Sequence, residues 1–128
     1  MQFYTAKRVE MSFDEAIERV TAELKAEGFG VLTDIDVRDT LKKKINVDFR
    51  RYRILGACNP PFAHKALSLE DKVGLMMPCN VVVQDLPGGG VEVAAINPEV
   101  GMQAIGNEAL AGLAAEVRAK LERAIARV

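Results

Sequence analysis

Apolar and polar positions alternate at the start of the chain and then repeat with a helical period. Residues 2–9 alternate loosely, which predicts a first strand. Ser12 and Glu15 then match a capping box, in which the two side chains satisfy free backbone amides at a helix start. The helix behind this cap ends at Gly28, a residue typical of helix C-termini, and places four apolar residues on one stripe: Phe13, Ile17, Val20 and Leu24.

A second strand and a short helix follow. Residues 29–35 alternate again, with one face more apolar than the other, as in a half-buried strand. Asp36 can cap a helix that ends near three lysines, which favour the negative end of the helix dipole. We expect three apolar side chains of this helix to face inward: Val37, Leu41 and Ile45.

Residues 49–69 predict a strand that leads into another short helix. Within residues 49–58, one phase of the alternation carries Tyr52, Ile54, Gly56 and Cys58. We expect this phase to point inward. Asn59 is followed by two prolines, a pattern that indicates the start of a helix, and this helix ends near Leu69.

The rest of the chain predicts a hairpin and a long helix. Pro78 interrupts an apolar run, which is typical of an edge strand or a bulge. Residues 79–96 form a hairpin around a glycine-rich turn. The final helix carries six apolar residues on one stripe: Leu110, Leu113, Val117, Leu121, Ile125 and Val128. We therefore expect an α+β fold of two layers, with a mainly antiparallel sheet and helices mostly on one face.

Composition places the chain among soluble globular proteins. It has 128 residues, 49% of them hydrophobic and 27% charged, and a net charge of −1. This length suits one domain, residues 1–128, and the near-neutral charge argues against a general role on nucleic acid or on a membrane surface. We expect no signal peptide and no membrane span, which predicts a cytoplasmic protein with its two cysteines reduced.

Two Cys-Asn pairs and one histidine are the candidate chemistry. The pairs are Cys58 with Asn59 and Cys79 with Asn80, and the histidine is His64. Thiolates and imidazole bind soft metals such as zinc or copper, and thiols also serve redox steps. The spacing matches no strong metal motif. The alternative interpretation is structural, with the cysteines as small buried residues and the histidine at the surface.

The positions of the cysteines suggest one shared pocket. Cys58 ends a strand and Cys79 begins another, so we expect the two on neighbouring strands, facing the same pocket. Asn59 and Asn80 would support the loop backbones. With His64 nearby, the two thiols could bind zinc or copper, whereas thiols within bonding geometry could form a reversible disulfide.

Charge is distributed unevenly along the chain. Residues 38–53 hold seven basic side chains against two acidic ones, and residues 10–36 hold eight acidic against two basic ones. The basic segment could bind an anionic partner, although a solvated face or subunit pairing is the favoured interpretation. Because no catalytic motif is present, we predict a small ligand- or ion-binding domain and not an enzyme, with a thiol-redox or metal-handling function as the alternative.

Three segments, residues 28–37, 52–67 and 74–83, resemble the bacterial and archaeal family called domain of unknown function 302. The motif residues that match are Gly56, Cys58, Asn59, Pro60, His64, Pro78, Cys79 and Asn80. The resemblance covers nearly the whole chain. It implies a compact α+β fold similar to the TATA-binding-protein-like arrangement, and a homodimer. It implies neither DNA binding nor an established reaction.

Overall fold

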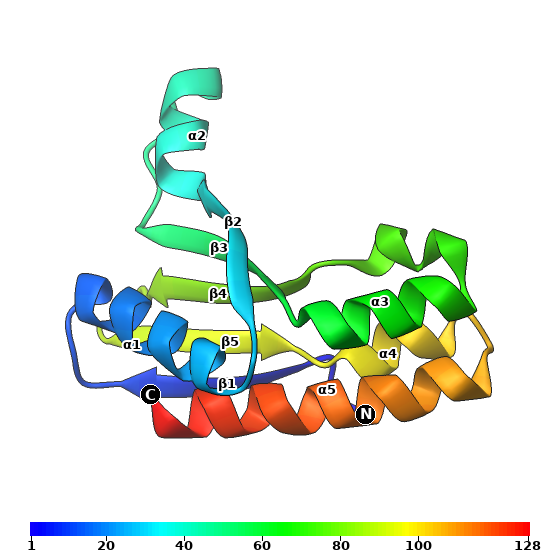
Figure 1. Ribbon diagram of the computed structural model, residues 1–128. Helices are drawn as coiled ribbons and strands as arrows, with labels where there is room; N and C mark the ends of the chain where they lie inside the picture. The colour runs from blue at the N-terminus through cyan, green and yellow to red at the C-terminus, as the bar shows by residue number, and fades with distance from the viewer.

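One antiparallel sheet of five strands organises the structure, which is a computed structural model of residues 1–128 (Figure 1). The strands are β1 (Tyr4–Val9), β2 (Gly30–Asp36), β3 (Tyr52–Cys58), β4 (Cys79–Asp85) and β5 (Val91–Ile96). Their order across the sheet is β1-β5-β4-β3-β2, and each neighbouring pair is antiparallel. The predicted α+β class and the antiparallel sheet are confirmed.

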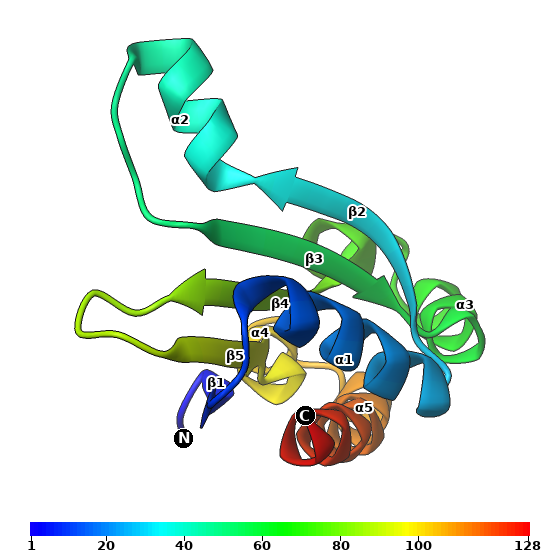
Figure 2. The ribbon, with the colours of Figure 1, turned by 90° about the vertical axis from the view of Figure 1, so that its left-hand side faces the viewer.

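Helices occupy one face of the sheet and one end of it. They are α1 (Phe13–Ala26), α2 (Val37–Ile45), α3 (Pro60–Leu69), α4 (Pro98–Gln103), α5 (Glu108–Arg127) and a 3₁₀ helix, η1 (Asp71–Met76). α1 and α5 pack against the sheet (Figures 1 and 2). α2 lies away from these two helices, and its main contacts are with β2 and β3. None of the helices combines the length and the apolar character that a membrane crossing requires.

The first helix forms as its sequence predicts. The backbone amide of Glu15 donates a hydrogen bond to the Ser12 hydroxyl at 3.1 Å, which satisfies one free amide of the first turn. Gly28 follows the helix with a φ of +88°, a conformation that favours glycine. The side chains buried on the inner stripe are Phe13, Ala16, Val20 and Leu24.

The core lies between the sheet and the two long helices. The strand side chains that point toward α1 and α5 contribute to it, among them Leu55, Val81 and Val93, each almost completely buried. α5 adds Leu121 and Ile125, together with the small Ala124. Burying side chains of this size contributes about 1.5–3 kcal/mol each, more than an exposed ion pair does.

The structure corrects three predictions, two about which residues face inward and one about the position of β4 in the sheet. α2 has no buried residue, and Ile45 is 63% exposed, because this helix packs on no second layer. β4 is the central strand and not an edge, since Pro78 precedes the strand instead of interrupting it. In β3 the phase with Leu55 and Ala57 points into the core, and Cys58 belongs to the opposite phase.

The face of the sheet that α1 and α5 leave uncovered is called the bare face. On this face the strands approach one another closely at Gly56. Gly56 of β3 is opposite Thr33 of β2 and Asn80 of β4. A Cβ atom at Gly56 would collide with the Thr33 hydroxyl and would lie 2.7 Å from the Pro78 ring. Glycine is therefore required here for steric reasons, and it lets the segment before Cys79 pass close to β3.

Two leucines of α5 test the packing. Leu121→Ala should lower the free energy of unfolding by about 2–5 kcal/mol, because the side chain is enclosed by the core. Leu113→Ala should cost clearly less, because Leu113 is half-buried and borders an open cavity. Urea unfolding of both variants measures the difference. Equal losses would show that the two leucines are equally enclosed.

Candidate functional site

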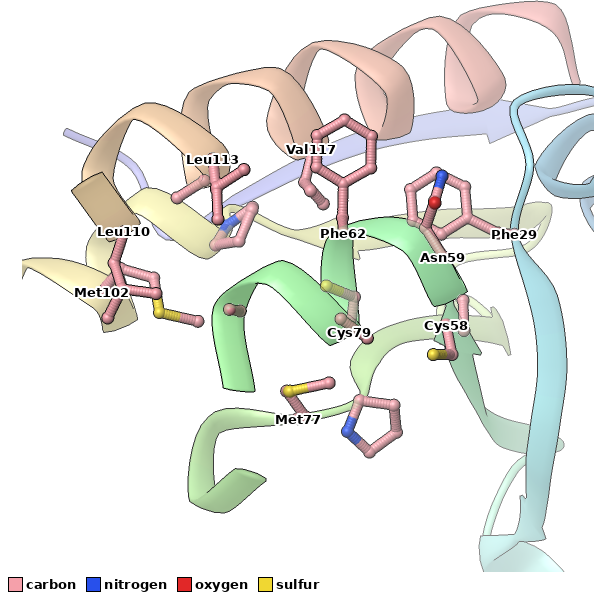
Figure 3. Close-up of a pocket in the computed structure, with 16 residues that line it drawn as sticks. Phe29, Cys58, Asn59, Phe62, Met77, Cys79, Met102, Leu110, Leu113 and Val117 are labelled. Atoms are coloured by element: carbon pink, nitrogen blue, oxygen red, sulfur yellow. The ribbon is translucent and has the colours of Figure 1, made fainter. Parts of the chain in front are cut away.

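An apolar cavity lies at the end of the sheet where β3 finishes and β4 begins (Figure 3). α3, α4 and α5 surround it; its free volume is about 60 Å³, and the whole hollow together with its open mouth measures about 530 Å³. Sixteen residues line it, and 13 of them are hydrophobic. Ligand sites in proteins have this character, concave and mostly apolar with a few polar groups.

The cavity exists because α3 presents small side chains to α5. Ala63 and Ala66 line it from α3, opposite Leu113 and Val117 of α5. The alanines leave space that a larger residue would fill, and no residue of α3 is fully buried. α3 therefore covers the cavity without closing it.

Two flexible methionines and one aromatic ring form another part of the cavity wall. Met77, just before β4, and Met102, in α4, both line the cavity. Phe62 adds its ring from the first turn of α3 (Figure 3). Methionine has three rotatable bonds and a polarisable sulfur, so this wall can adapt to the shape of a ligand.

Asn59 is the amide group in the wall. It is 8% exposed, and its Nδ2 donates a hydrogen bond to the carbonyl oxygen of Glu27 at 3.2 Å. Asn59 precedes α3, but its side chain makes no capping hydrogen bond and instead ties the start of α3 to the end of α1. Its Oδ1 accepts no hydrogen bond from the protein and is not a buried, unsatisfied atom.

Both cysteines line the cavity, from neighbouring strands, as the sequence led us to expect. Cys79 pairs with Ala57 in the sheet register, which places it on the core face, whereas Cys58 follows Ala57 and has the opposite phase. The two sulfur atoms are accordingly apart in Figure 3. Both cysteines are free thiols.

Burial suppresses the ionisation of Cys79. Loss of solvent, together with the nearby thiol of Cys58, raises the pKa of Cys79 from its ordinary value of 9.0 to about 11. Metal binding and thiol exchange both use the thiolate. Cys79 is therefore protonated at neutral pH, which weakens the redox alternative.

His64 and Asn80 lie outside the cavity. His64 is exposed on α3, because Phe62, Ala63 and Ala66 form the side of the helix that faces the cavity and His64 is rotated away from it. Asn80 is exposed on the bare side of the sheet, opposite Gly56.

The joint metal site on Cys58, His64 and Cys79 stays a prediction from the sequence, and the positions of these residues do not support it. The chain contains no group of three or more histidine, cysteine or acidic side chains placed to hold a metal ion. The opposite phases of the two cysteines and the outward turn of His64 are the physical reasons.

The basic segment is partly paired within the chain. Arg51 binds Asp85 at 2.7 Å, and Arg53 binds Asp34. Lys42 and Lys43 reach carboxylates at 3.1 and 3.0 Å. Four of the seven basic side chains of residues 38–53 thus have an acidic partner in the same chain.

Sequence reasoning missed most of the cavity wall. We expected Leu113 and Val117 in the core, and nothing in the sequence pattern marked Met77 and Met102 as residues of a cavity. The two alanines on the apolar side of α3 are the one local hint, because a stripe of small residues packs loosely against a stripe of large ones.

The pKa of Cys79 predicts how stability depends on pH. Below about pH 9 the thiol is protonated in both states; between about 9 and 11 only the unfolded chain releases the proton, so stability falls as pH rises. Between about pH 8 and about pH 10 this lowers the free energy of unfolding by roughly 1 kcal/mol. Urea unfolding should show this loss in the wild type and not in Cys79→Ala. The same pH dependence in both proteins would contradict the assignment.

Comparison with known proteins agrees with the fold. Residues 5–128 match the family described as domain of unknown function DUF302. The crystal structure of an uncharacterized conserved DUF302 protein from Bacillus stearothermophilus superposes with a TM-score of 0.92 at 31% sequence identity. The alignment covers 99% of this chain and 98% of that chain. No match was found among curated proteins. The resemblance seen in the two Cys-Asn motifs is confirmed, and the chain belongs to the DUF302 family.

Proposed function

We propose that the protein is a binding domain that holds a small apolar ligand in the cavity between α3 and α5. The observation that carries this proposal is the wall, in which 13 of 16 residues are hydrophobic around space that no side chain fills. An unfilled apolar cavity costs packing energy, and an apolar ligand would restore the missing contacts.

The wall offers a ligand almost no polar contact. The Nδ2 of Asn59, the amide residue of the wall, is used in its hydrogen bond to the Glu27 carbonyl oxygen. A ligand with a mostly apolar surface would therefore match the cavity.

The same groups favour binding over catalysis. An amide and a protonated thiol are poor general bases at neutral pH. His64, the one imidazole, lies on the outer side of α3. The cytoplasmic location stays a prediction from the sequence.

Benzene is a suitable probe, because it enters dry apolar cavities and needs no polar partner. The methionine methyl groups can report on it when labelled with carbon-13. Titration with benzene should shift the NMR signals of Met77 and Met102, which line the cavity, and leave those of Met1 and Met11 in place. Equal shifts at Met77, Met102, Met1 and Met11, or no shift at any of them, would contradict the proposal.

A pair of matched variants gives the control. Ala66→Leu fills the cavity and should weaken benzene binding about tenfold, which corresponds to a loss of about 1.4 kcal/mol. Ala115→Leu makes the same change on the exposed side of α5 and should leave binding unchanged. Binding that is equal in the two variants would show that the probe binds elsewhere.

A further inference from the structure

We propose that the ligand of the cavity is an anionic amphiphile, a carboxylate with a short apolar tail, and that Lys65 and Lys120 bind its head group at the rim. This inference rests on the binding function proposed above, because the cavity must hold the tail. It adds the chemical class of the ligand and the two residues that select its charge. The observation that carries it is a pair of unpaired lysines beside one residue of the cavity wall, Phe62.

Phe62 marks the rim of the cavity. Its ring projects from the first turn of α3 toward α5 and lines the cavity (Figure 3). The side chain is only half-buried, so one part of it faces the cavity and another part faces solvent. A ligand that lies along this ring therefore has its tail in the cavity and its other end in solvent.

Two lysines reach this ring from different helices. The Nζ of Lys65, in α3, lies 5.6 Å from the ring centroid, and the Nζ of Lys120, in α5, lies 5.9 Å from it. Both ammonium groups are thus beside the boundary between the apolar wall and solvent. Because Lys120 is half-buried and the ring limits access of water, these charges are screened less than those of lysines that extend fully into solvent.

Neither Lys65 nor Lys120 has an acidic partner. No ion pair of the chain includes either residue. The other three basic residues of α5, Arg118, Arg123 and Arg127, each bind a carboxylate. α3 contains no acidic residue at all. The rim therefore carries two positive charges that the chain leaves unpaired, whereas the remaining basic side chains of α5 are used within the fold.

The start of α3 adds a partial charge of the same sign. The first turn of this helix has no acidic residue, and no side chain caps it with a hydrogen bond. The positive end of the helix dipole is therefore not compensated there. Phe62 is the third residue of α3, so an anion beside its ring interacts favourably with the dipole and with both lysines, and a cation is repelled by all three.

The size and the chemistry of the site define the class of ligand. The free volume of about 60 Å³ admits only a short tail, which the flexible Met77 and Met102 can accommodate by changing rotamer. A lysine presents a single point charge, without the fixed fork of donors by which arginine selects the shape of an anion. The rim thus selects the charge of the head group and the cavity selects an apolar tail, which makes hexanoate a suitable probe.

A comparison of head groups on one chain length tests the inference in the wild type. Hexanoate, 1-hexanol and hexylammonium are titrated at low salt, and the methyl signals of Met77 and Met102 report binding. Hexanoate should bind about tenfold more tightly than hexylammonium, with 1-hexanol between them, and high salt should reduce the difference. Equal affinities for hexanoate and hexylammonium, with benzene still bound, would overturn this inference and leave the binding function in place. Absence of benzene binding would overturn both.

Reversal of the two charges identifies the residues. The double variant Lys65→Glu/Lys120→Glu should prefer hexylammonium to hexanoate and should still bind benzene, which has no head group. Arg38→Glu/Lys44→Glu makes the same change of net charge at two exposed, unpaired residues of α2, which does not line the cavity, and it should keep the preference for hexanoate. An unchanged preference in the first variant, or the same reversal in the second, would overturn the assignment.

A milder substitution applies even where the double variant does not fold. Lys65→Gln, at an exposed position, removes one charge and should weaken hexanoate binding about threefold while the affinity for 1-hexanol stays the same. An equal loss for both ligands would show that Lys65 acts through the shape of the rim and not through its charge, and would overturn its role in binding the head group.

Discussion

Side chains of a strand point alternately to the two faces of a sheet, and this two-residue period links every feature of the structure. In β3 it turns Leu55 and Ala57 toward α1 and α5 and leaves Ile54 on the bare face. In β4 it sends Val81 and Cys79 to the core and Val82 to the bare face. The sheet therefore has a covered face with a cavity at its end, and an uncovered apolar face.

The cavity depends on a mismatch of side-chain size between two helices. Ala63 and Ala66 of α3 line the cavity together with Leu113 and Val117 of α5, and the two small side chains leave space in the layer that covers the end of the sheet. Most proteins fill such space, because packing stabilises the fold. Asn59 anchors the start of α3 to the end of α1 and keeps the space from collapsing at that end. The proposed ligand would fill this space.

Local signals in the sequence predicted the elements well, whereas tertiary placement escaped them. The cap at Ser12 and the stripe of α5 depend on neighbours in the chain, so they could be predicted. The inner phase of β3 could not, because both phases are apolar and only the paired strands decide between them. The sequence of α2 predicts an apolar side, but it does not show whether another element covers that side. The direction in which His64 faces depends on how α3 packs against α5, which the local sequence does not determine.

A crystal structure determined under xenon pressure tests the central claim most directly, since xenon binds in dry apolar cavities without changing them. The account predicts a xenon atom between α3 and α5, within contact of Ala66 and Val117, and its loss in Ala66→Leu. A structure in which α3 closes onto α5 and xenon is absent would contradict the account.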